Sequence, residues 1–328
     1  MAETRYRGRR AASIENELVR VTVLHEGGHI AEILDKGSGV NPLWTPPWES
    51  IEPSTYDLRK HPEYGADAES KLLSGIMGHN LCMDIFGPPS EEEAAAGLTV
   101  HGEASVAAYE VTAGEATLTQ RARLPQAQLR IERHIRLDGR TAEITEVVEN
   151  ESITDRPIAW TEHVTIGPPF LEKGITEFRA PVTQSHVLEK GCGDFERYTD
   201  APVSGGFTSY LMDPALDAVY FAAWSPRSRV GLAYAWRRAD FPWLGVWEEN
   251  YSRTGAPWNG RTLTRGMEFG ASPIAETRRR MVERGSLFGV PAFRWIPARG
   301  RVRVDYCATV GQADGAAGVL EGLAGRLG

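Results

Sequence analysis

From residue 104 to residue 150 the sequence reads as one β-strand after another. Hydrophobic and polar residues alternate in ATLTQRARL, QLRIERHIRL and AEITEVVEN, and Asp138-Gly139 provides a turn between the last two runs. No segment with a helical period interrupts them. Parallel strands need long crossover connections, usually helices. The pattern therefore excludes a βαβ fold for this half of the chain and predicts an antiparallel sandwich or barrel.

The rest of the chain extends the same all-β pattern. Residues 14–35 predict a hairpin that turns at Gly27-Gly28, and residues 171–240 hold short runs such as AVYFAAWS and VGLAYAWR between Pro, Gly and Asp. Short helices are expected only after Ser90, at residues 274–284 and in the C-terminal tail, where Leu327 is among the periodic leucines. No repeat or linker divides the chain, so we predict one domain over residues 1–328.

Residues 42–78 are the least regular stretch. The run WTPPWESIEPSTYDLRKHPEYG is dense in proline and aromatic residues and has no clean period. Aromatic side chains in an irregular segment need either a core below them or a ligand above them. We expect a long loop, which either packs on the surface or contributes to a functional site.

The charge and cysteine content exclude several classes of protein. A net charge of −8 argues against nucleic-acid binding, since phosphate recognition needs a concentrated basic surface. The 3 cysteines are scattered without a CxxC spacing, which indicates neither a zinc ribbon nor a disulfide framework and suits a reducing compartment. No apolar run has the length of a signal-peptide core or a membrane span. We therefore expect a soluble, cytoplasmic protein with no membrane partner.

Two residues are the leading candidates for chemistry. His163 closes the predicted strand PIAWTEH, and Gly167-Pro168-Pro169 soon after it cannot continue a ladder, so we expect the chain to leave the sheet just past His163 and the imidazole to lie near a rim. Glu268 stands between Met267 and Phe269 in a strand that should be buried. A carboxylate there must be paired or have a raised pKa, and such groups cluster at functional sites.

Weaker candidates are His101 in TVHGEA and the group His79, Asn80 and Asp84. A single histidine at a strand end is more often a hydrogen-bonded structural residue than a catalytic one. His79, Asp84, His101 and His163 are all metal-ligating types, but no HxH or HExxH spacing supports a metal, and we predict none. A GxSxG nucleophile motif and a phosphate-binding loop are also missing from the sequence.

Taken in order, four motifs resemble the aldose 1-epimerase (galactose mutarotase) superfamily. They are NELVRVTVLHEGGHIAEI, LTVHGEAS, the run from LRIERHIRLDG to TEHVTIGPPFL, and TRGMEFGASP, and together they span about residues 14 to 310. The resemblance implies a large twisted antiparallel β-sandwich, the galactose mutarotase-like supersandwich, with a sugar site in a groove of one sheet. It identifies the chain as a divergent member.

The resemblance also implies roles for particular residues and no cofactor. Glu268 matches the catalytic base, His163 the acid, and His101 a second histidine that donates a hydrogen bond near the ring oxygen. A base that takes the anomeric proton and an acid that protonates the ring oxygen would open a hemiacetal, and reclosure would give the other anomer. Trp160, Trp247 and Trp258 could stack on the apolar faces of a pyranose, or belong to the core.

The chain departs from the superfamily where the sugar hydroxyls would be bound. The usual arginine upstream of His-Gly is absent, and GIMGHNLCMDIFGPPS offers His79, Asn80 and Asp84 instead. The substrate-binding aspartate has two candidate counterparts, Asp240 and Glu248.

Three functions remain open at this stage. The leading hypothesis is an aldose 1-epimerase-like isomerase acting on a monosaccharide or modified sugar. The alternatives are a carbohydrate-binding or sensing protein without turnover, and a sugar-acting lyase or hydrolase. The acidic balance disfavours a phosphosugar, although Arg121, Arg123 and Arg261 could form a local basic patch. A homodimer is an open alternative for the assembly.

Overall fold

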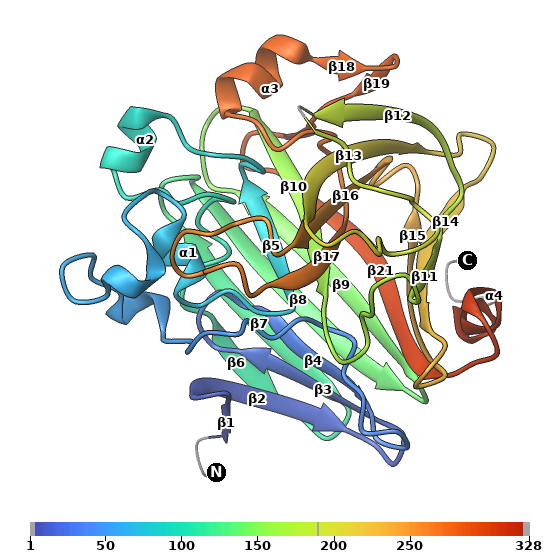
Figure 1. The fold of residues 1–328 in the computed structure, drawn as a ribbon. Coiled ribbons are helices and arrows are strands. Elements are labelled where there is room, and N and C mark those ends of the chain that lie inside the picture. Colours follow the sequence, from blue (N-terminus) through green and yellow to red (C-terminus); the bar gives the residue numbers. More distant parts are fainter. Residues whose placement is uncertain (1–3, 189, 324–328) are drawn as a thin grey trace.

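The computed structural model describes residues 4–188 and 190–323, and its long strands form two antiparallel sheets packed face to face (Figure 1). The first sheet has the order β1 (Thr4–Tyr6), β2 (Arg9–Glu15), β3 (Val19–Leu24), β4 (Ile30–Asp35), β5 (His79–Asp84), β10 (Arg156–Ile166), β17 (Leu263–Gly270), β16 (Trp243–Asn250), β13 (Ser204–Met212) and β12 (Val182–Leu188), and β20 (Arg294–Ile296) pairs with β10. The second has the order β11 (Glu177–Arg179), β14 (Ala218–Ser225), β15 (Val230–Arg237), β21 (Arg301–Gln312), β9 (Thr141–Asn150), β8 (Leu129–Asp138), β7 (Thr117–Leu124) and β6 (Glu110–Ala113).

Short elements lie at the periphery of the sheets (Figure 1). They are α1 (Ser70–Leu73), α2 (Glu91–Ala95), α3 (Arg278–Arg284), α4 (Ala316–Val319), the 3-10 turns η1 (Pro53–Thr55), η2 (Pro62–Tyr64) and η3 (Leu320–Leu323), and the hairpin of β18 (Ser286–Leu287) and β19 (Val290–Pro291). None of the helices in residues 4–188 and 190–323 has the length and apolar character needed to cross a bilayer. The predicted all-β sandwich with few short helices is confirmed.

Local sequence explains the best-predicted elements. In β8 and β9 alternate residues are buried, and Asp138 pairs with Thr141 across the predicted Asp-Gly turn. The β3–β4 hairpin turns at Gly27 and Gly28, whose φ values of 78° and 61° suit glycine. Ser90 caps α2 in a capping box with Glu93.

Four sequence expectations need correction. His163 is not at a rim, because β10 continues to Ile166 and pairs with β5 on one side and β17 on the other. Residues 104–109 form loop and turn, and the strand expected there starts at Glu110. The helix expected at residues 274–284 begins only at Arg278, because Thr277 caps it. The terminal helix is split into α4 and η3, and Leu327 lies outside the described residues.

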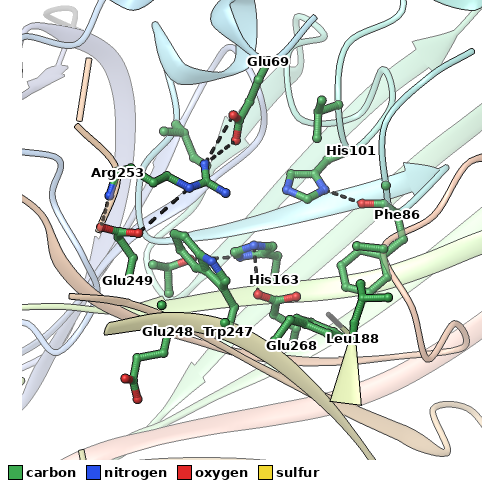
Figure 2. Close-up of a pocket in the computed structure, with 18 of the residues that line it drawn as sticks. Glu69, Phe86, His101, His163, Leu188, Trp247, Glu248, Glu249, Arg253 and Glu268 are labelled. Carbon is green, nitrogen blue, oxygen red and sulfur yellow. Dashed lines mark hydrogen bonds and ion pairs between the residues drawn. The ribbon is translucent and has the colours of Figure 1, made fainter. Parts of the chain in front are cut away.

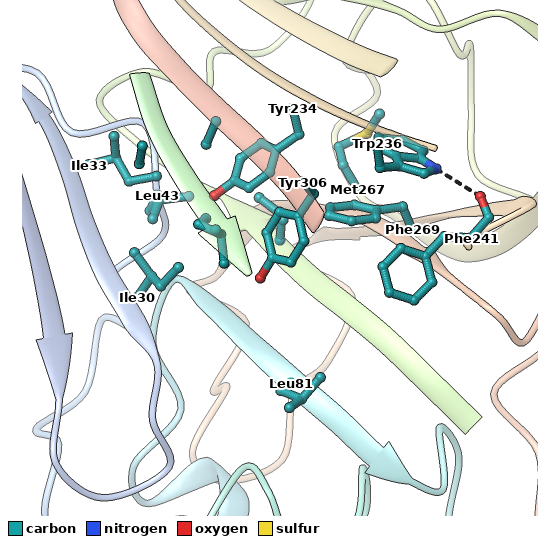
Figure 3. Close-up of a cluster of buried hydrophobic side chains, with 14 of the residues drawn as sticks. Ile30, Ile33, Leu43, Leu81, Tyr234, Trp236, Phe241, Met267, Phe269 and Tyr306 are labelled. Atoms are coloured by element: carbon teal, nitrogen blue, oxygen red, sulfur yellow. Dashed lines mark hydrogen bonds between the residues drawn. The ribbon is translucent and has the colours of Figure 1, made fainter. Parts of the chain in front are cut away.

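A hydrophobic core fills the space between the two sheets (Figure 3). The rings of Trp236 and Phe269 stack with centroids 4.2 Å apart, and Leu81 and Met267 from the first sheet are fully buried in the same cluster. This packing fixes which face of each strand points inward. In β10 and β17, neighbouring residues therefore point alternately toward the core and toward the outer face of the first sheet.

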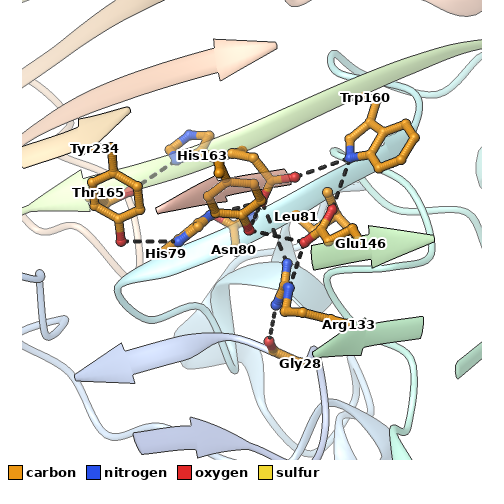
Figure 4. Close-up of polar contacts among 12 residues, drawn as sticks. Gly28, His79, Asn80, Leu81, Arg133, Glu146, Trp160, His163, Thr165 and Tyr234 are labelled. Atoms are coloured by element: carbon orange, nitrogen blue, oxygen red, sulfur yellow. Dashed lines mark hydrogen bonds and ion pairs between the residues drawn. The ribbon is translucent and has the colours of Figure 1, made fainter. Parts of the chain in front are cut away.

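A buried polar network crosses this core (Figure 4). Arg133 of β8 donates from Nε to Oε1 of Glu146 at 2.5 Å, and its Nη2 lies 3.5 Å from Oε2 of Glu162 in the first sheet. Trp160 Nε1 donates to both carboxylates, at 3.0 and 3.1 Å. Burial and the charge of Arg133 lower the pKa of His79 to about 3, so its imidazole is neutral and bonds Glu162 at 2.9 Å.

The network also changes the pKa values of its buried carboxyl groups. Burial raises the pKa of Glu146 to about 7, although the Arg133 guanidinium opposes the rise. Tyr306 donates its hydroxyl to Glu146 and Glu162, at 3.0 Å each. The Arg133 guanidinium is thus the cationic partner of two fully buried carboxyl groups, Glu146 in the second sheet and Glu162 in the first. It therefore links the two sheets.

Candidate active site

A cavity of about 470 Å³ opens on the outer face of the first sheet, away from the core. Its floor comes from β10, β17, β16 and β13, and the segments around residues 42–78, 86–88, 100–101 and 251–258 rise around it. His163 of β10 is the register partner of Glu268 of β17, and directly paired residues of antiparallel strands point to the same face. The sheet therefore places both leading candidates side by side on the cavity floor.

His163 and Glu268 contact each other directly (Figure 2). The Nε2 atom of His163 lies 3.1 Å from Oε1 of Glu268, and its Nδ1 atom lies 2.9 Å from the Thr165 hydroxyl. His163 is 5% exposed and Glu268 3%, so both side chains are almost dry while they still line the cavity. The imidazole is held from both of its nitrogens, which fixes its ring plane.

Burial moves the two pKa values in opposite directions. The Glu268 carboxyl has a pKa well above its usual value because its charge is desolvated. The His163 imidazole has a pKa well below its usual value, first because of burial and then because His101 is close. Both shifts favour the uncharged form of the group, which places a carboxyl that can give a proton beside an imidazole nitrogen that can accept one.

Glycines clear the space around Glu268. A Cβ at Gly266 would lie 2.3 Å from Oε1 of Glu268, and a Cβ at Gly245, the cross-strand neighbour of Glu268, would lie 2.7 Å from the Phe207 ring. A side chain at Gly266 would therefore displace the Glu268 carboxyl, and one at Gly245 would displace the Phe207 ring. Glycine at these positions leaves the carboxyl free to face the cavity.

His101 lies beside the pair, with its ring centroid 5.0 Å from that of His163. Its Nδ1 atom is 2.6 Å from the carbonyl oxygen of Phe86, and since a carbonyl only accepts, Nδ1 carries the hydrogen. Burial lowers the pKa of His101 to about 4. Its Nε2 atom is therefore unprotonated near pH 7 and can accept a hydrogen bond from a ligand hydroxyl, whereas the expected donor role needs a proton on Nε2.

The opposite side of the cavity is aromatic and charged, and sequence reasoning missed its cation. The Arg253 guanidinium lies 4.7 Å from the ring centroid of Trp258 and 5.4 Å from that of Trp247. Its Nη1 atom donates to Oε1 of Glu69 at 3.1 Å, and Glu249 lies near its Nε. Arg253 thus supplies a cation to a site in which the sequence offered no arginine upstream of His101.

Two irregular segments are joined above this side. Trp44 stacks on Trp258 with an interplanar angle of 11°, and Trp48 meets both rings edge to face. Together with the Arg253–Glu69 ion pair, this cluster fastens the loop of residues 42–78 to the segment after β16. The proline- and tryptophan-rich stretch is therefore packed, and some of its residues also line the cavity.

Several predicted binding residues lie away from the cavity. His79 and Trp160 point between the sheets, because they belong to the inward face of β5 and β10. Asn80 is on the outer face beside His163, but it is fully buried and donates to the Ser105 hydroxyl. These three residues do not line the cavity.

Both predicted aspartates are engaged in ion pairs outside the cavity. Asp84 binds Arg278 and lies 3.1 Å from Arg156, and Asp240 is paired with Arg237 and Arg294. Trp247 and Glu248 do line the cavity. The Glu248 carboxylate is partly occupied, since Ser204 donates to it at 2.6 Å and Arg265 lies 3.4 Å away.

The basic patch considered for a phosphosugar does not form at this site. Arg121 and Arg123 are exposed on the second sheet and pair with Glu132 and Glu151. The charge of Arg253 is balanced along the cavity, because the guanidinium pairs with Glu69 and lies beside Glu249. The Glu248 carboxylate points away from the cavity toward Ser204 and Arg265 (Figure 2). This lining suits a neutral polyol better than a phosphorylated one.

The buried carboxyl predicts that Glu268→Gln makes the fold more stable at high pH. The raised pKa means that wild-type stability is highest below the unfolded value of about 4.3 and falls as pH rises through the folded value. Glutamine does not titrate, so its advantage should grow from pH 5 to pH 8 by about 1–3 kcal/mol, measured by urea unfolding. Glu115→Gln, at an exposed turn, should stay within ~0.5 kcal/mol at both pH values. An advantage that is equal at both pH values would contradict the assignment.

The sandwich topology and its outer-face cavity define a galactose mutarotase-like fold. A protein from Klebsiella pneumoniae, whose assignment as an aldose 1-epimerase is provisional, superposes with a TM-score of 0.72 at 17% identity, over 96% of this chain and 82% of that one. A galactose mutarotase related enzyme from Lactobacillus acidophilus gives 0.62 at 13% identity, over 92% and 97%. These likenesses establish the fold.

A more particular assignment comes from the sequence itself. The family model described as "Domain of unknown function (DUF4432)" matches residues 6–256, and the chain belongs to this family. No curated protein matches the sequence. The protein is thus a DUF4432 member with the galactose mutarotase-like fold.

Proposed function

We propose that the protein is a cofactor-independent, aldose 1-epimerase-like isomerase that interconverts the anomers of a neutral sugar. The observation that carries the proposal is the contact of Glu268 with His163, whose Oε1 and Nε2 atoms lie 3.1 Å apart on the floor of a cavity. A hemiacetal presents the two reacting oxygens on a single carbon, so a proton donor and a proton acceptor placed side by side can address both.

The pair accounts for both proton transfers. One member takes the proton of the O1 hydroxyl while the other gives its proton to the ring oxygen, and the C1–O5 bond breaks to leave an open-chain aldehyde. After rotation about C1–C2, the ring oxygen attacks the other face of the aldehyde. The two residues then act in reversed roles, so either one can begin the cycle and no proton is lost to solvent.

The surrounding residues support binding of a polyol. His101 Nε2 accepts from one hydroxyl, Arg253 donates to another, and the Trp247 ring offers an apolar face to the pyranose. His163 and Trp247 have ring centroids 6.1 Å apart, so a sugar over Trp247 would reach the acid–base pair. The names of the similar structures agree with this proposal but concern other proteins.

The opposite pKa shifts of Glu268 and His163 predict a bell-shaped pH profile with a plateau that includes pH 7. Below the plateau protonation of His163 removes the acceptor, and above it ionisation of Glu268 removes the donor. Because burial lowers the first pKa and raises the second, kcat/KM should vary less than about twofold from pH 6 to pH 8. A tenfold change over that range, measured by polarimetry in buffers of equal ionic strength, would show that the two residues do not hold these protonation states.

Polarimetry of freshly dissolved sugars tests the function itself. A panel of α- and β-aldoses should contain at least one sugar whose optical rotation reaches its equilibrium value faster with the protein. If no rate rises but a sugar raises the melting temperature, the protein is a carbohydrate-binding or sensing protein. A new reducing end or double bond in the products would instead identify a hydrolase or lyase.

A further inference from the structure

The cavity has an apolar side that the acid–base chemistry does not use. Its lining residues there carry no hydrogen-bonding side-chain group: Phe86, Pro88, Leu188, Phe207 and Ala275. Figure 2 shows Phe86 and Leu188 on one side of Glu268 and His163, and Arg253, Glu249 and Glu69 on the other. The catalytic pair therefore lies between a charged side and an apolar one.

This apolar side is built into the fold rather than left by a mobile loop. Leu188 of β12 is the register partner of Phe207 of β13, and the Phe207 and Phe86 rings lie 6.0 Å apart in an edge arrangement. Phe86 also lies against His101, at 6.0 Å between centroids. The same cluster continues behind the cavity through Cys82 and Met281. Water at this wall therefore finds few hydrogen-bonding partners.

In a pyranose, C2 is bonded to C1 and C5 is bonded to the ring oxygen O5. When C1 and O5 lie at the acid–base pair, the substituents on C2 and C5 therefore point to opposite sides of the pair. On the charged side the Arg253 guanidinium, 40% exposed, can donate to hydroxyls. A hydroxyl that contacts Phe207 and Leu188 would leave water without gaining a side-chain partner from them, which costs free energy, whereas a methyl group would gain contacts with both. Lys190 lines the cavity too, but it is exposed and keeps its hydration.

We propose that the preferred substrates are 6-deoxy sugars, whose C5 methyl group packs against Phe86, Leu188 and Phe207. This inference rests on the proposed epimerase function and names its substrate class. A methyl group at C5 fills apolar space, whereas removal of the C2 hydroxyl leaves only hydrogen there. The preference should therefore be for the 6-deoxy sugar over both its parent and the 2-deoxy isomer.

Matched sugars test the proposal by anomer-exchange kinetics. 6-Deoxy-D-glucose should exceed D-glucose in kcat/KM by about 10- to 100-fold, and L-fucose should exceed L-galactose similarly, because a site that cannot pair a hydroxyl discriminates against it. Parent sugars that react as fast as their 6-deoxy partners would overturn the proposal. A preference for 2-deoxy-D-glucose over both D-glucose and 6-deoxy-D-glucose would also overturn it.

A polar substitution at the wall provides the second arm. Leu188→Asn on the edge strand β12 offers partners to a C6 hydroxyl and should reduce the 6-deoxy preference at least fivefold. Val187→Asn, at the adjacent and more exposed position, should leave the preference unchanged. If both variants keep the wild-type ratio, the apolar side does not select the substrate.

The outcome remains interpretable if no sugar is turned over. In that case the proposed epimerase function fails, and ligand-induced melting shifts with the same sugar pairs still test the apolar side. A larger shift with 6-deoxy-D-glucose than with D-glucose, lost in Leu188→Asn, would support the substrate class for a binding protein. Equal shifts would overturn it.

Discussion

Glu268→Gln is expected to lower kcat/KM for anomer exchange by about 10²- to 10⁴-fold, the range for loss of a general acid–base group. The amide can still fill the space and bond His163, but it neither gives nor takes a proton at the ring oxygen or O1. His163→Gln should cause a loss of similar size. Because the two residues act as one unit, the double variant should be little worse than either single variant.

The control for this prediction is stability, since a variant could lose activity by unfolding. Glu268→Gln should be at least as stable as wild type near pH 8, because it removes a carboxyl that burial disfavours in its charged form. A variant that is folded, stable and fully active would remove Glu268 from the mechanism.

Arg133→Met is expected to destabilise the protein by about 3–5 kcal/mol, as removing one partner of a buried ion pair commonly does. The variant leaves Glu146 and Glu162 between the sheets without a cation and removes the donor to the Gly28 carbonyl, 2.8 Å away. A loss of this size is a large part of the stability of an ordinary domain. The change should appear as a lower urea midpoint at pH 8.

Arg136→Met provides a matched control on the same strand. Arg136 is exposed and pairs with Glu143 at the surface, so its loss should cost less than about 1 kcal/mol. At lower pH the Arg133→Met penalty should shrink, because the pKa of Glu146 is raised to about 7 even with the guanidinium present. Equal costs for the two variants would show that the network does not hold the sheets together.

The sandwich could be predicted from the sequence because several of its strands alternate hydrophobic and polar residues. β8 and β9 bury alternate residues and turn at Asp138-Gly139, and Gly27-Gly28 marks the β3–β4 hairpin. Strands covered on both faces were harder to interpret. All six residues of β5 are buried, so nothing in HNLCMD shows that His79 points into the core while Asn80 faces outward.

The candidate site was only partly accessible to sequence reasoning. Glu268 attracted attention as a carboxylate in an apolar strand, and the structure sets it against His163 through strand register. Arg253 and Glu69 were missed because their contact joins residues 184 positions apart. Such a pair is set by the packing of two irregular segments, which local patterns do not encode. The tryptophans of those segments were the available signal.

The measurement that tests the central claim most directly is two-dimensional exchange NMR on an equilibrium mixture of sugar anomers. It detects interconversion of the α and β anomeric protons with no net reaction. We predict exchange cross-peaks with wild-type protein at mixing times too short for the uncatalysed process, and their loss with Glu268→Gln under the same conditions. Cross-peaks of equal intensity with both proteins, above the protein-free control, would contradict the claim that Glu268 and His163 exchange the anomeric proton.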